Sequence, residues 1–406
     1  MTEQRPTAHS AWRRLWLVPL GTAIAVAIAA CSSASSSSVQ QNSSSPPASQ
    51  ASQPSPAASS SGASAAQVNT AALAAAKAAG SPTKVPTETI GYLRYIAADS
   101  SDQRIYNAFV AAADVLGWKV ISCDGQGNPT VMVQCMNTLL ADHPAAIVND
   151  GIPQSLIATG LQQAKSEGIP TVYTGGSLTP ANLYTAGYVP PDAAMGQMLG
   201  NYIVQQLSKL SGTQDVIAQT FAAPWGQARV NSLTTAIKGT NVKIVAQPAA
   251  DATNLVQGTQ SQISSLLTQY PNAKAVWVTF DGAVSGAAQA VAAKYPGESF
   301  PQAPMVATFY DELQTLQLIR QGMVTVTVAE PLEWCSWVAA DQLAEYFARK
   351  TPLSQSVRPD YGADMTFWQP TLVTKANLPP AGQLVTPPVN FVSFFKTKWH
   401  AEFGVG

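Results

Sequence analysis

After residue 85, short apolar runs rich in β-branched residues alternate with longer segments whose apolar residues recur at helical spacing. Such an alternation predicts a parallel sheet with helices on both faces, because each pair of parallel strands needs a crossover connection. Strands are expected in the first half at residues 89–95, 119–122, 145–149 and 170–174, and helices at 105–116, 129–140 and 154–167.

A second series of the same kind follows a helix expected at residues 195–210. Its strands are expected at 215–221, 242–246, 275–280, 304–309 and 324–328, and its helices at 227–238, 255–269, 282–293 and 313–321. The sequence therefore predicts two doubly wound α/β lobes. Open sheets of this kind bind ligands beyond the carboxyl ends of their strands, and paired lobes enclose a cleft there.

Composition excludes several classes of function. The 406 residues carry 22 Lys plus Arg and 23 Asp plus Glu, so the chain lacks the basic excess of a nucleic-acid binder. The three histidines are far apart in sequence, which argues against a multi-His metal site. No nucleophile elbow, HExxH, Walker loop or GxGxxG motif occurs. We therefore expect no catalytic residue, no metal and no cofactor.

The first 31 residues are typical of an export signal, with three arginines before an uncharged run at 15–30. That run is shorter than the ~20 residues of a membrane-spanning helix. It ends in Ile28-Ala29-Ala30-Cys31, which resembles the bacterial lipobox and implies lipidation of Cys31. A plain secretory signal with an incidental cysteine is the alternative. The adjacent Arg13-Arg14 leaves open whether export is general or twin-arginine.

Residues 32–84 are expected to form a disordered tether. Ser, Ala, Pro and Gln dominate residues 32–66, and no charge follows until Lys77, so little apolar surface can be buried there. An Ala-rich stretch at 68–79 can form a fraying helix before Gly80. The tether would let a folded body reach away from a membrane surface.

Two of the four cysteines lie close together in the first half. Cys123 ends an expected strand and Cys135 lies in the following helix, so a disulfide between them is geometrically feasible in an exported protein. Two small buried thiols are the alternative. Cys335 has no evident partner and is expected in the core.

Residues just past the strand ends are the candidates for ligand binding. In the first half these are Asp99 and Asp102, for which helix capping is the competing explanation. Gly175-Gly176 offers a close-approach turn. In the second half the candidates are Trp225, Arg229, Phe280, Asp281, Tyr310 and Glu330. Aromatic faces can cover the C–H face of a sugar, while Arg and carboxylates hold hydroxyls.

The order and spacing of elements across residues 85–400 resemble the type I periplasmic binding proteins of the ribose-binding sort. Residues 89–174, with Leu116-Gly117-Trp118, Asp124 and Asn128-Pro129, are similar to that family's first lobe. Residues 188–200, with Asp192 and Gly196, resemble its first hinge crossing. Residues 275–282, 304–310, 322–331 and 369–374 follow in the same order.

The resemblance implies two lobes joined by three hinge strands, with one lobe formed by 85–191 plus 332–368 and the other by 192–331 plus 369–406. It implies hinges near Asp192, Glu330 and Gln369, and closure of a monomer on a small ligand. Delivery to the permease subunits of an ABC importer would follow. The protein would act outside the cytoplasm, held to the membrane by its lipid.

Carried over position by position, the family's lobe-two arginine falls on Arg229. We expect its guanidinium to donate to ligand oxygens, the alternative being a surface residue paired with a carboxylate. The family's other site residues fall on different residue types here, namely Phe280 beside Asp281, Tyr310, Glu330, Ser101 with Asp102, and Gly175-Gly176. These differences are compatible with the fold but argue against specificity for a pentose. Stacking against the ligand would then come from Trp225, Phe280 and Tyr310 of the second lobe.

The favoured function is thus a lipid-anchored solute-binding protein for a sugar or sugar-like ligand. A sensor lipoprotein that presents a signalling molecule to a membrane receptor is the alternative. An enzyme of a doubly wound fold lacks an evident general base here. A DNA-binding repressor of this core fold would need a helix-turn-helix where this chain has its export signal and tether.

Overall fold

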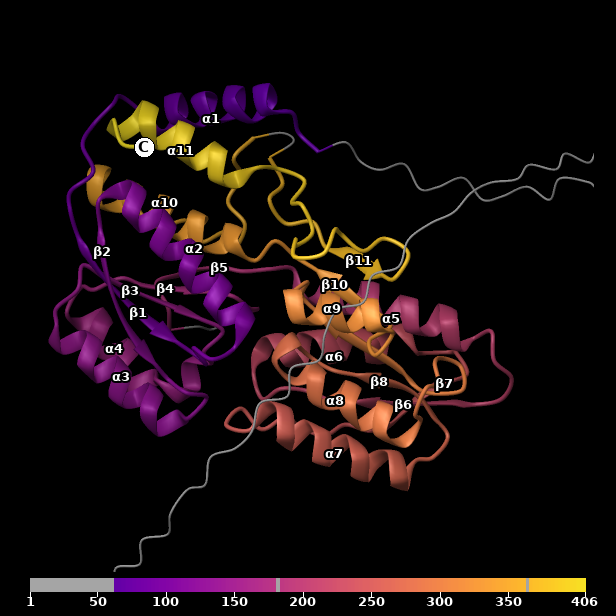
Figure 1. Ribbon diagram of the computed structural model, residues 1–406. Helices are drawn as coiled ribbons and strands as arrows, with labels where there is room; N and C mark the ends of the chain where they lie inside the picture. The colour runs from indigo at the N-terminus through magenta and orange to yellow at the C-terminus, as the bar shows by residue number, and fades with distance from the viewer. Residues whose placement is uncertain (1–61, 180–182, 363–364) are drawn as a thin grey trace, which may run out of the picture. The chain divides into compact units, whose positions relative to one another are not determined.

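The computed structural model describes residues 62–406 except 180–182 and 363–364. Within them lie two sheets, each with its own covering helices (Figure 1). The predicted export signal, Cys31 and most of the predicted tether lie outside the described residues. No helix in the described part is long and apolar enough to cross a membrane.

The first sheet is entirely parallel and has the strand order β2-β1-β3-β4-β5. Its strands are β1 (Thr89–Arg94), β2 (Lys119–Asp124), β3 (Ala146–Asp150), β4 (Thr171–Thr174) and β5 (Ala186–Tyr188). The helices among them are α2 (Ser100–Leu116), α3 (Pro129–Ala141), a 3₁₀ turn at Gln154–Leu156 and α4 (Ala158–Ser166). The helix predicted at 154–167 is therefore divided, because Ile157 leaves the helical backbone region with φ −130°.

The second sheet has the order β11-β10-β9-β8-β6-β7, parallel except for the edge pair β10–β11. Its strands are β6 (Gln214–Ala218), β7 (Val242–Ala246), β8 (Ala273–Trp277), β9 (Met305–Phe309), β10 (Val326–Ala329) and β11 (Thr371–Thr374). Its helices are α5 (Asp192–Leu207), α6 (Pro224–Ala236), α7 (Leu255–Gln269), α8 (Asp281–Lys294) and α9 (Leu313–Gln321). This arrangement agrees with the predicted two-lobed α/β fold.

The chain passes between the two sheets more than once. It leaves β5 for α5, which contacts β9 and β10, and it leaves β10 for α10 (Glu333–Arg349), which packs on α2, β4 and β5. It then returns to β11 on the second sheet. These three passages lie near the three predicted hinges, whose motion stays a prediction.

The C-terminal helix α11 (Phe391–Phe403) corrects one predicted boundary. It packs on α10 and on α1 (Ala65–Ala79), and its Phe394, Phe395 and Trp399 join the apolar core that includes Tyr92 of β1. The family resemblance predicts that all of 369–406 belongs to the second lobe, but burial of this aromatic face places α11 with the first sheet. The chain therefore makes a further passage after β11.

The predicted tether is also too long. Helix α1 begins with a capping box, in which the side chains of Ser64 and Gln67 each accept a hydrogen bond from the other's backbone N–H. It buries Val68, Ala72 and Ala76 against its neighbours, and none of the three is more than 5% exposed. Residues 65–79 are thus part of the folded body, because docking on α11 stabilises a helix that would fray alone.

Candidate functional site

A cavity of about 440 Å³, mouth included, opens where the carboxyl ends of both sheets meet. Gly175 follows β4 and Tyr310 follows β9, but the other lining residues of the first sheet lie at or after the ends of β1 and β3, and those of the second sheet lie after β6 and β8. These are the positions at which the strand order of each sheet reverses, where α/β sheets bind ligands. The lining residues are Tyr95, Ile96, Asp99, Ser101, Asp102, Ile105, Asp150, Gly151, Gly175, Phe221, Trp225, Phe280 and Tyr310.

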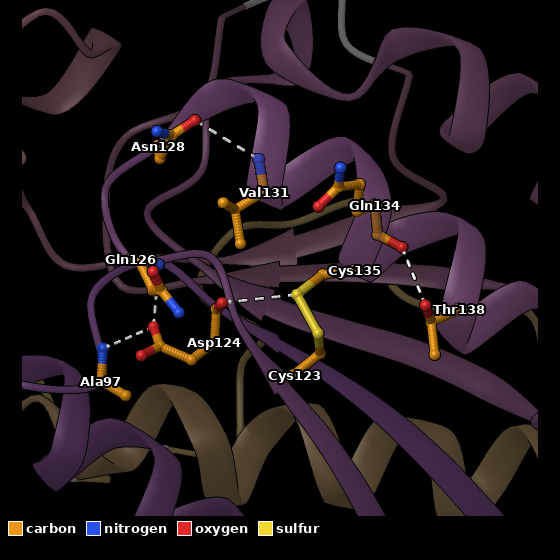
Figure 2. The surroundings of a disulfide bond; sticks show 9 residues. All are labelled: Ala97, Cys123, Asp124, Gln126, Asn128, Val131, Gln134, Cys135 and Thr138. Atoms are coloured by element: carbon orange, nitrogen blue, oxygen red, sulfur yellow. Dashed lines mark hydrogen bonds between the residues drawn. A yellow bond between two sulfur atoms is a disulfide. The ribbon is translucent and has the colours of Figure 1, made fainter. Parts of the chain in front are cut away.

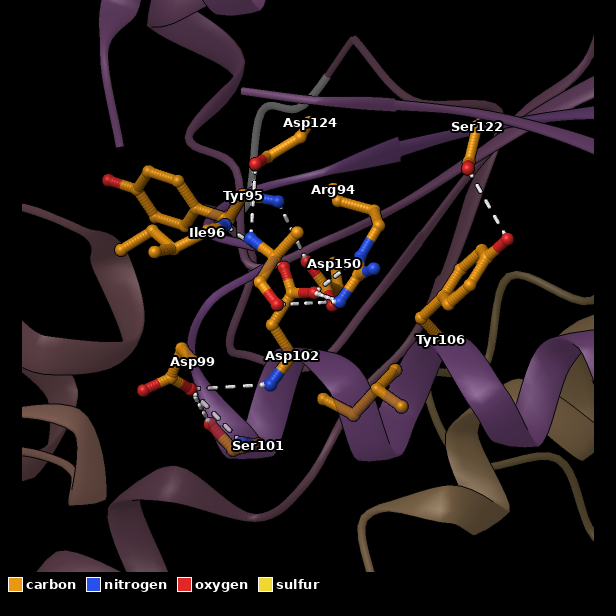
Figure 3. A network of polar contacts seen from close by, with 12 residues as sticks. Arg94, Tyr95, Ile96, Asp99, Ser101, Asp102, Tyr106, Ser122, Asp124 and Asp150 are labelled. Atoms are coloured by element: carbon orange, nitrogen blue, oxygen red, sulfur yellow. Dashed lines mark hydrogen bonds and ion pairs between the residues drawn. The ribbon is translucent and has the colours of Figure 1, made fainter. Parts of the chain in front are cut away.

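Carboxyl groups form the first sheet's side of the cavity (Figure 3). Asp102 accepts from Arg94 Nε at 2.7 Å and from the Ile96 backbone N–H at 3.0 Å. Asp99 caps α2, since its Oδ1 accepts from the backbone of Ser101 and Asp102. Asp150 accepts at Oδ1 from the Tyr95 backbone at 3.3 Å. The capping explanation thus holds for Asp99, although its side chain also lines the cavity.

Burial raises the pKa of all three of these carboxyls. For Asp102 the neighbouring Arg94 opposes this rise. For Asp150 the rise is large, and the negative charge of Asp102 adds to it. The pKa of Asp99 is raised by burial in spite of its hydrogen bond from Ser101. This side of the cavity is therefore a set of crowded acids, of which only Asp102 pairs with a guanidinium, that of Arg94.

Aromatic rings form the second sheet's side. Phe221 stacks on Trp225 with ring centroids 4.7 Å apart, and Phe280 meets both edge-on at 5.2 and 5.6 Å. Tyr95 extends the group from the first sheet, 5.7 Å from Phe221. The Trp225 Nε1–H donates to the Gly151 carbonyl at 3.1 Å and so joins the two sides. Trp225, Phe280 and Tyr310, all predicted from the sequence, are brought together here.

Backbone geometry aims two of these rings. Gly176 has no Cβ, and one built there would lie 2.5 Å from Trp225 Cδ1, so only glycine lets the indole pack against this turn. Tyr310 adopts φ +69°, which is rare for a bulky residue. Its backbone is held by bonds to Val328 and Thr327, at 2.8 and 2.6 Å. Strain of this kind concentrates at functional sites.

Arg229 does not line the cavity, which differs from the prediction for a ligand-donating guanidinium. It is fully buried, donates from Nε to Asp192 at 2.8 Å and also donates to the Thr279 carbonyl and the Tyr310 hydroxyl. The alternative was right about a carboxylate partner but wrong about the surface. All of its N–H groups face protein, so Arg229 supports the ring of Tyr310 from behind.

Asp281 and Glu330, also predicted, lie outside the cavity lining. Asp281 begins α8 and accepts from the Ser100 hydroxyl at 2.9 Å. Glu330 is fully buried and accepts from Trp334 Nε1 at 3.1 Å. Burial raises the pKa of Glu330 to about 8. Neither carboxyl reaches the cavity because each is turned toward a neighbouring segment of the chain.

A second arginine that the sequence analysis did not single out connects the two sides. Arg104 of α2 pairs with Asp311 at 2.9 Å, Glu312 at 3.0 Å and Glu333 at 2.6 Å. Burial raises the pKa of Glu312 to about 7, although Arg104 opposes the rise. Arg104 lies in α2 between the cavity residues Asp102 and Ile105, and that position is the signal that could have indicated it.

The acidic and aromatic residues missed inside the cavity are Tyr95, Asp150 and Phe221. Each follows the end of a strand, as the predicted ones do: Tyr95 follows β1, Asp150 ends β3 and Phe221 comes shortly after β6. The same strand-end rule could therefore have found them. Tyr95 and Phe221 were missed because an isolated tyrosine or phenylalanine beside a strand is ordinary core composition.

Cys123 and Cys135 are joined by a disulfide between β2 and α3, with their Cα atoms 5.4 Å apart (Figure 2). The Sγ of Cys135 lies 3.4 Å from the Asp124 carbonyl oxygen, and neither cysteine lines the cavity. Cys335 is a buried free thiol in α10. Within the described residues, no group of three or more His, Cys, Asp or Glu side chains is placed to hold a metal ion.

The chain belongs to the periplasmic binding protein domain family, whose model matches residues 90–351. This is a family of extracytoplasmic substrate-binding proteins rather than enzymes. No curated protein sequence matches the chain.

Solved structures with the same fold include three with small polyols bound. An ABC transporter solute-binding protein from Mycobacterium smegmatis with bound glycerol has a TM-score of 0.63 at 19% identity, covering 74% of this chain and 99% of that one. One from Agrobacterium vitis with bound allitol has a TM-score of 0.61 at 23% identity, covering 72% and 97%. The Caulobacter myo-inositol binding protein, with myo-inositol bound, has a TM-score of 0.62 at 15% identity, covering 72% of this chain and 95% of that one. At these identities the likeness shows the fold.

Proposed function

We propose that this protein is a lipid-anchored solute-binding protein that captures a small polar, sugar-like ligand and delivers it to an ABC importer. The observation that carries the proposal is the cavity at the strand-order reversal of both sheets, lined by stacked rings on one side and carboxyls on the other. A ring face covers the C–H surface of a polyol, while carboxylates accept hydrogen bonds from its hydroxyls.

The structural neighbours support the class of ligand and the transport role. Those with bound glycerol and bound allitol are described as ABC transporter solute-binding proteins, and a third binds myo-inositol. All three ligands are small and rich in hydroxyl groups.

A thermal-shift screen of the purified protein tests this function. Glycerol, allitol, myo-inositol, common hexoses and their amino derivatives would be added singly, and a ligand at a hundred times its Kd adds ~2.7 kcal/mol to the stability. A variant with Trp225→Ala serves to show that a shift depends on the cavity. If no member of the panel shifts the melting temperature, solute capture of this kind is contradicted.

Ligand capture should close the cleft through the passages near Asp192, Glu330 and Gln369. In the proposed division, residues 85–191, α10 and α11 move as one lobe and residues 192–331 with β11 as the other. Small-angle scattering should show a smaller radius of gyration with saturating ligand than without it. An unchanged radius would contradict hinge closure.

The anchor is tested separately. Lipidation of Cys31 would hold the protein to the membrane, since each acyl CH₂ buried in the bilayer contributes ~0.8 kcal/mol. Cys31→Ser should move the protein from the membrane to the soluble fraction, and Cys335→Ser, at a buried thiol, should leave its location unchanged. Retention of Cys31→Ser in the membrane would contradict the lipoprotein assignment.

A further inference from the structure

We propose that the ligand of this cavity is a small hydroxylated organic cation rather than a neutral sugar. This inference rests on the proposed solute-binding function and makes its ligand class more specific. Three features of the cavity carry it: the balance of charge in its lining, an unpartnered carboxylate oxygen, and the arrangement of its rings.

The charge balance comes first. Asp99, Asp102 and Asp150 line the cavity, and in the part of the chain that the structure describes no lysine, arginine or histidine lines it. Nor does any asparagine or glutamine side chain, so a neutral sugar would find acceptors here without matching side-chain amide or guanidinium donors. A ligand that supplies donors and positive charge fits this lining better.

The nearby arginines are already occupied. Arg94 donates to Asp102 and to the Ala97 carbonyl. Arg229 is saturated by Asp192 and two further acceptors, and Arg104 is paired with acids outside the cavity. Within the described residues, Asp99 and Asp150 therefore form no ion pair.

The unpartnered oxygen belongs to Asp150. This side chain is only 3% exposed, and no hydrogen-bond donor in the described residues reaches its Oδ2. The Asp102 carboxyl beside it can pair with Asp150 only where one of the two carries a proton. A buried acceptor without a donor is costly, and an ammonium group would remove that cost.

The rings supply the other half of a cation site. Phe221, Trp225 and Phe280 lie in mutual contact, with Tyr95 and Tyr310 also lining the cavity. The negative faces of such rings attract an organic ammonium, most strongly when it is desolvated, and a cage of several rings selects quaternary ammonium groups. Carboxyls on one side and rings on the other would together surround one positively charged group of a ligand.

A cation bound in the cavity would lower the pKa of the crowded acids, which burial raises. The ionisable groups that act on Asp150 are Asp102, Arg94, Tyr92 and Tyr173, and both tyrosines have a pKa raised well above the ordinary value by burial. Asp150 and Asp102 are thus the acids whose pKa a cation in the cavity would lower most directly. Binding of a cation should therefore release a proton, whereas binding of a neutral polyol should not.

The experiment uses matched pairs of probes with the full chain in titration calorimetry. Glucosamine is compared with glucose, and choline with its uncharged carbon isostere 3,3-dimethylbutan-1-ol. We expect the charged member of at least one pair to bind about tenfold or more tightly than its neutral partner. Repeating the titration in buffers of different ionisation enthalpy should show proton release for that cation.

A conservative variant links the effect to the cavity. Asp150→Asn keeps the size of the side chain and should reduce the difference in binding affinity between the charged and the neutral probe of a pair. The control Asp142→Asn, at an exposed position, should leave that difference unchanged. Equal or tighter binding of the neutral member in both pairs would overturn the cation proposal and leave solute capture standing. Binding of no probe, here or in the polyol screen, would overturn both.

Discussion

The two sides of the cavity use different chemistry although each is built from the strand ends of a similar parallel sheet. The first side presents Asp99, Asp102 and Asp150 with one arginine, Arg94, that remains 11% exposed. The second presents stacked rings with one arginine, Arg229, that is completely buried behind them. The difference shows that equivalent positions in a doubly wound fold set where a site lies, while side chains alone set what it binds.

The two arginines play correspondingly different parts. The guanidinium of Arg229 lies 4.5 Å from the Phe309 ring centroid, 4.7 Å from that of Tyr310 and 5.1 Å from that of Trp225. It therefore holds the aromatic side as a structural unit. Arg94 lies over the Tyr106 ring at 4.5 Å and offsets the charge of one acid. Its loss should change the charge on the acidic side more than the packing.

The largest expected effect is that of Arg229→Ala. It leaves Asp192 buried without its cation, and breaking a fully buried ion pair costs ~3–5 kcal/mol. Urea unfolding of the variant should show that loss, and the exposed Lys238→Ala near the end of the same helix should show almost none. If Arg229→Ala retains wild-type stability and loses only ligand affinity, the earlier expectation of a ligand-binding guanidinium is restored.

Arg94→Ala should cost less, about 2 kcal/mol, because it removes charge-assisted hydrogen bonds at a partly exposed site. Asp102 keeps its bond from the Ile96 backbone, and water can reach the vacated position. The same urea measurement applies, with the exposed Lys119→Ala of the neighbouring strand as control. A loss as large as that of Arg229→Ala would erase the proposed difference between the two sides.

The smallest effect concerns pH. The pKa of Asp150 is raised by burial above its ordinary value of 3.8, so in the folded protein it holds a proton that the unfolded chain releases. Its contribution to stability is complete below pH 3.8 and is lost as pH rises through the raised pKa. One such group changes the unfolding free energy by at most ~1.4 kcal/mol per pH unit.

Asp150→Asn should therefore make the ligand-free protein's stability fall less steeply with rising pH. Melting temperatures measured across a pH series would show this, while Asp142→Asn and the aromatic variant Phe280→Leu should retain the wild-type slope. An unchanged slope in Asp150→Asn would mean that the acidic side is already ionised and solvated.

The sequence by itself determined the fold and the edge of each sheet at which the cavity lies. The β-branched residues at 242–246 and the helical spacing of apolar residues at 255–269 and 313–321 predicted β7, α7 and α9 at their observed bounds. Both signals are local in the sequence. Gly175-Gly176 was indicated as a close-approach turn, and the indole of Trp225 packs there. Trp225, Phe280 and Tyr310 were found because the carboxyl ends of parallel strands gather at one edge of a sheet.

Only the tertiary structure decided how charges pair and which helices dock. The sequence around Arg229 and Arg94 does not indicate their partners. Arg229 forms a buried ion pair with Asp192, and Arg94 pairs with Asp102. The same applies to α1, an Ala-rich segment that is stable because α11 covers it from more than 300 residues away. Periodicity is a property of neighbours along the chain, whereas ion pairing and burial depend on distances that the folded chain alone sets.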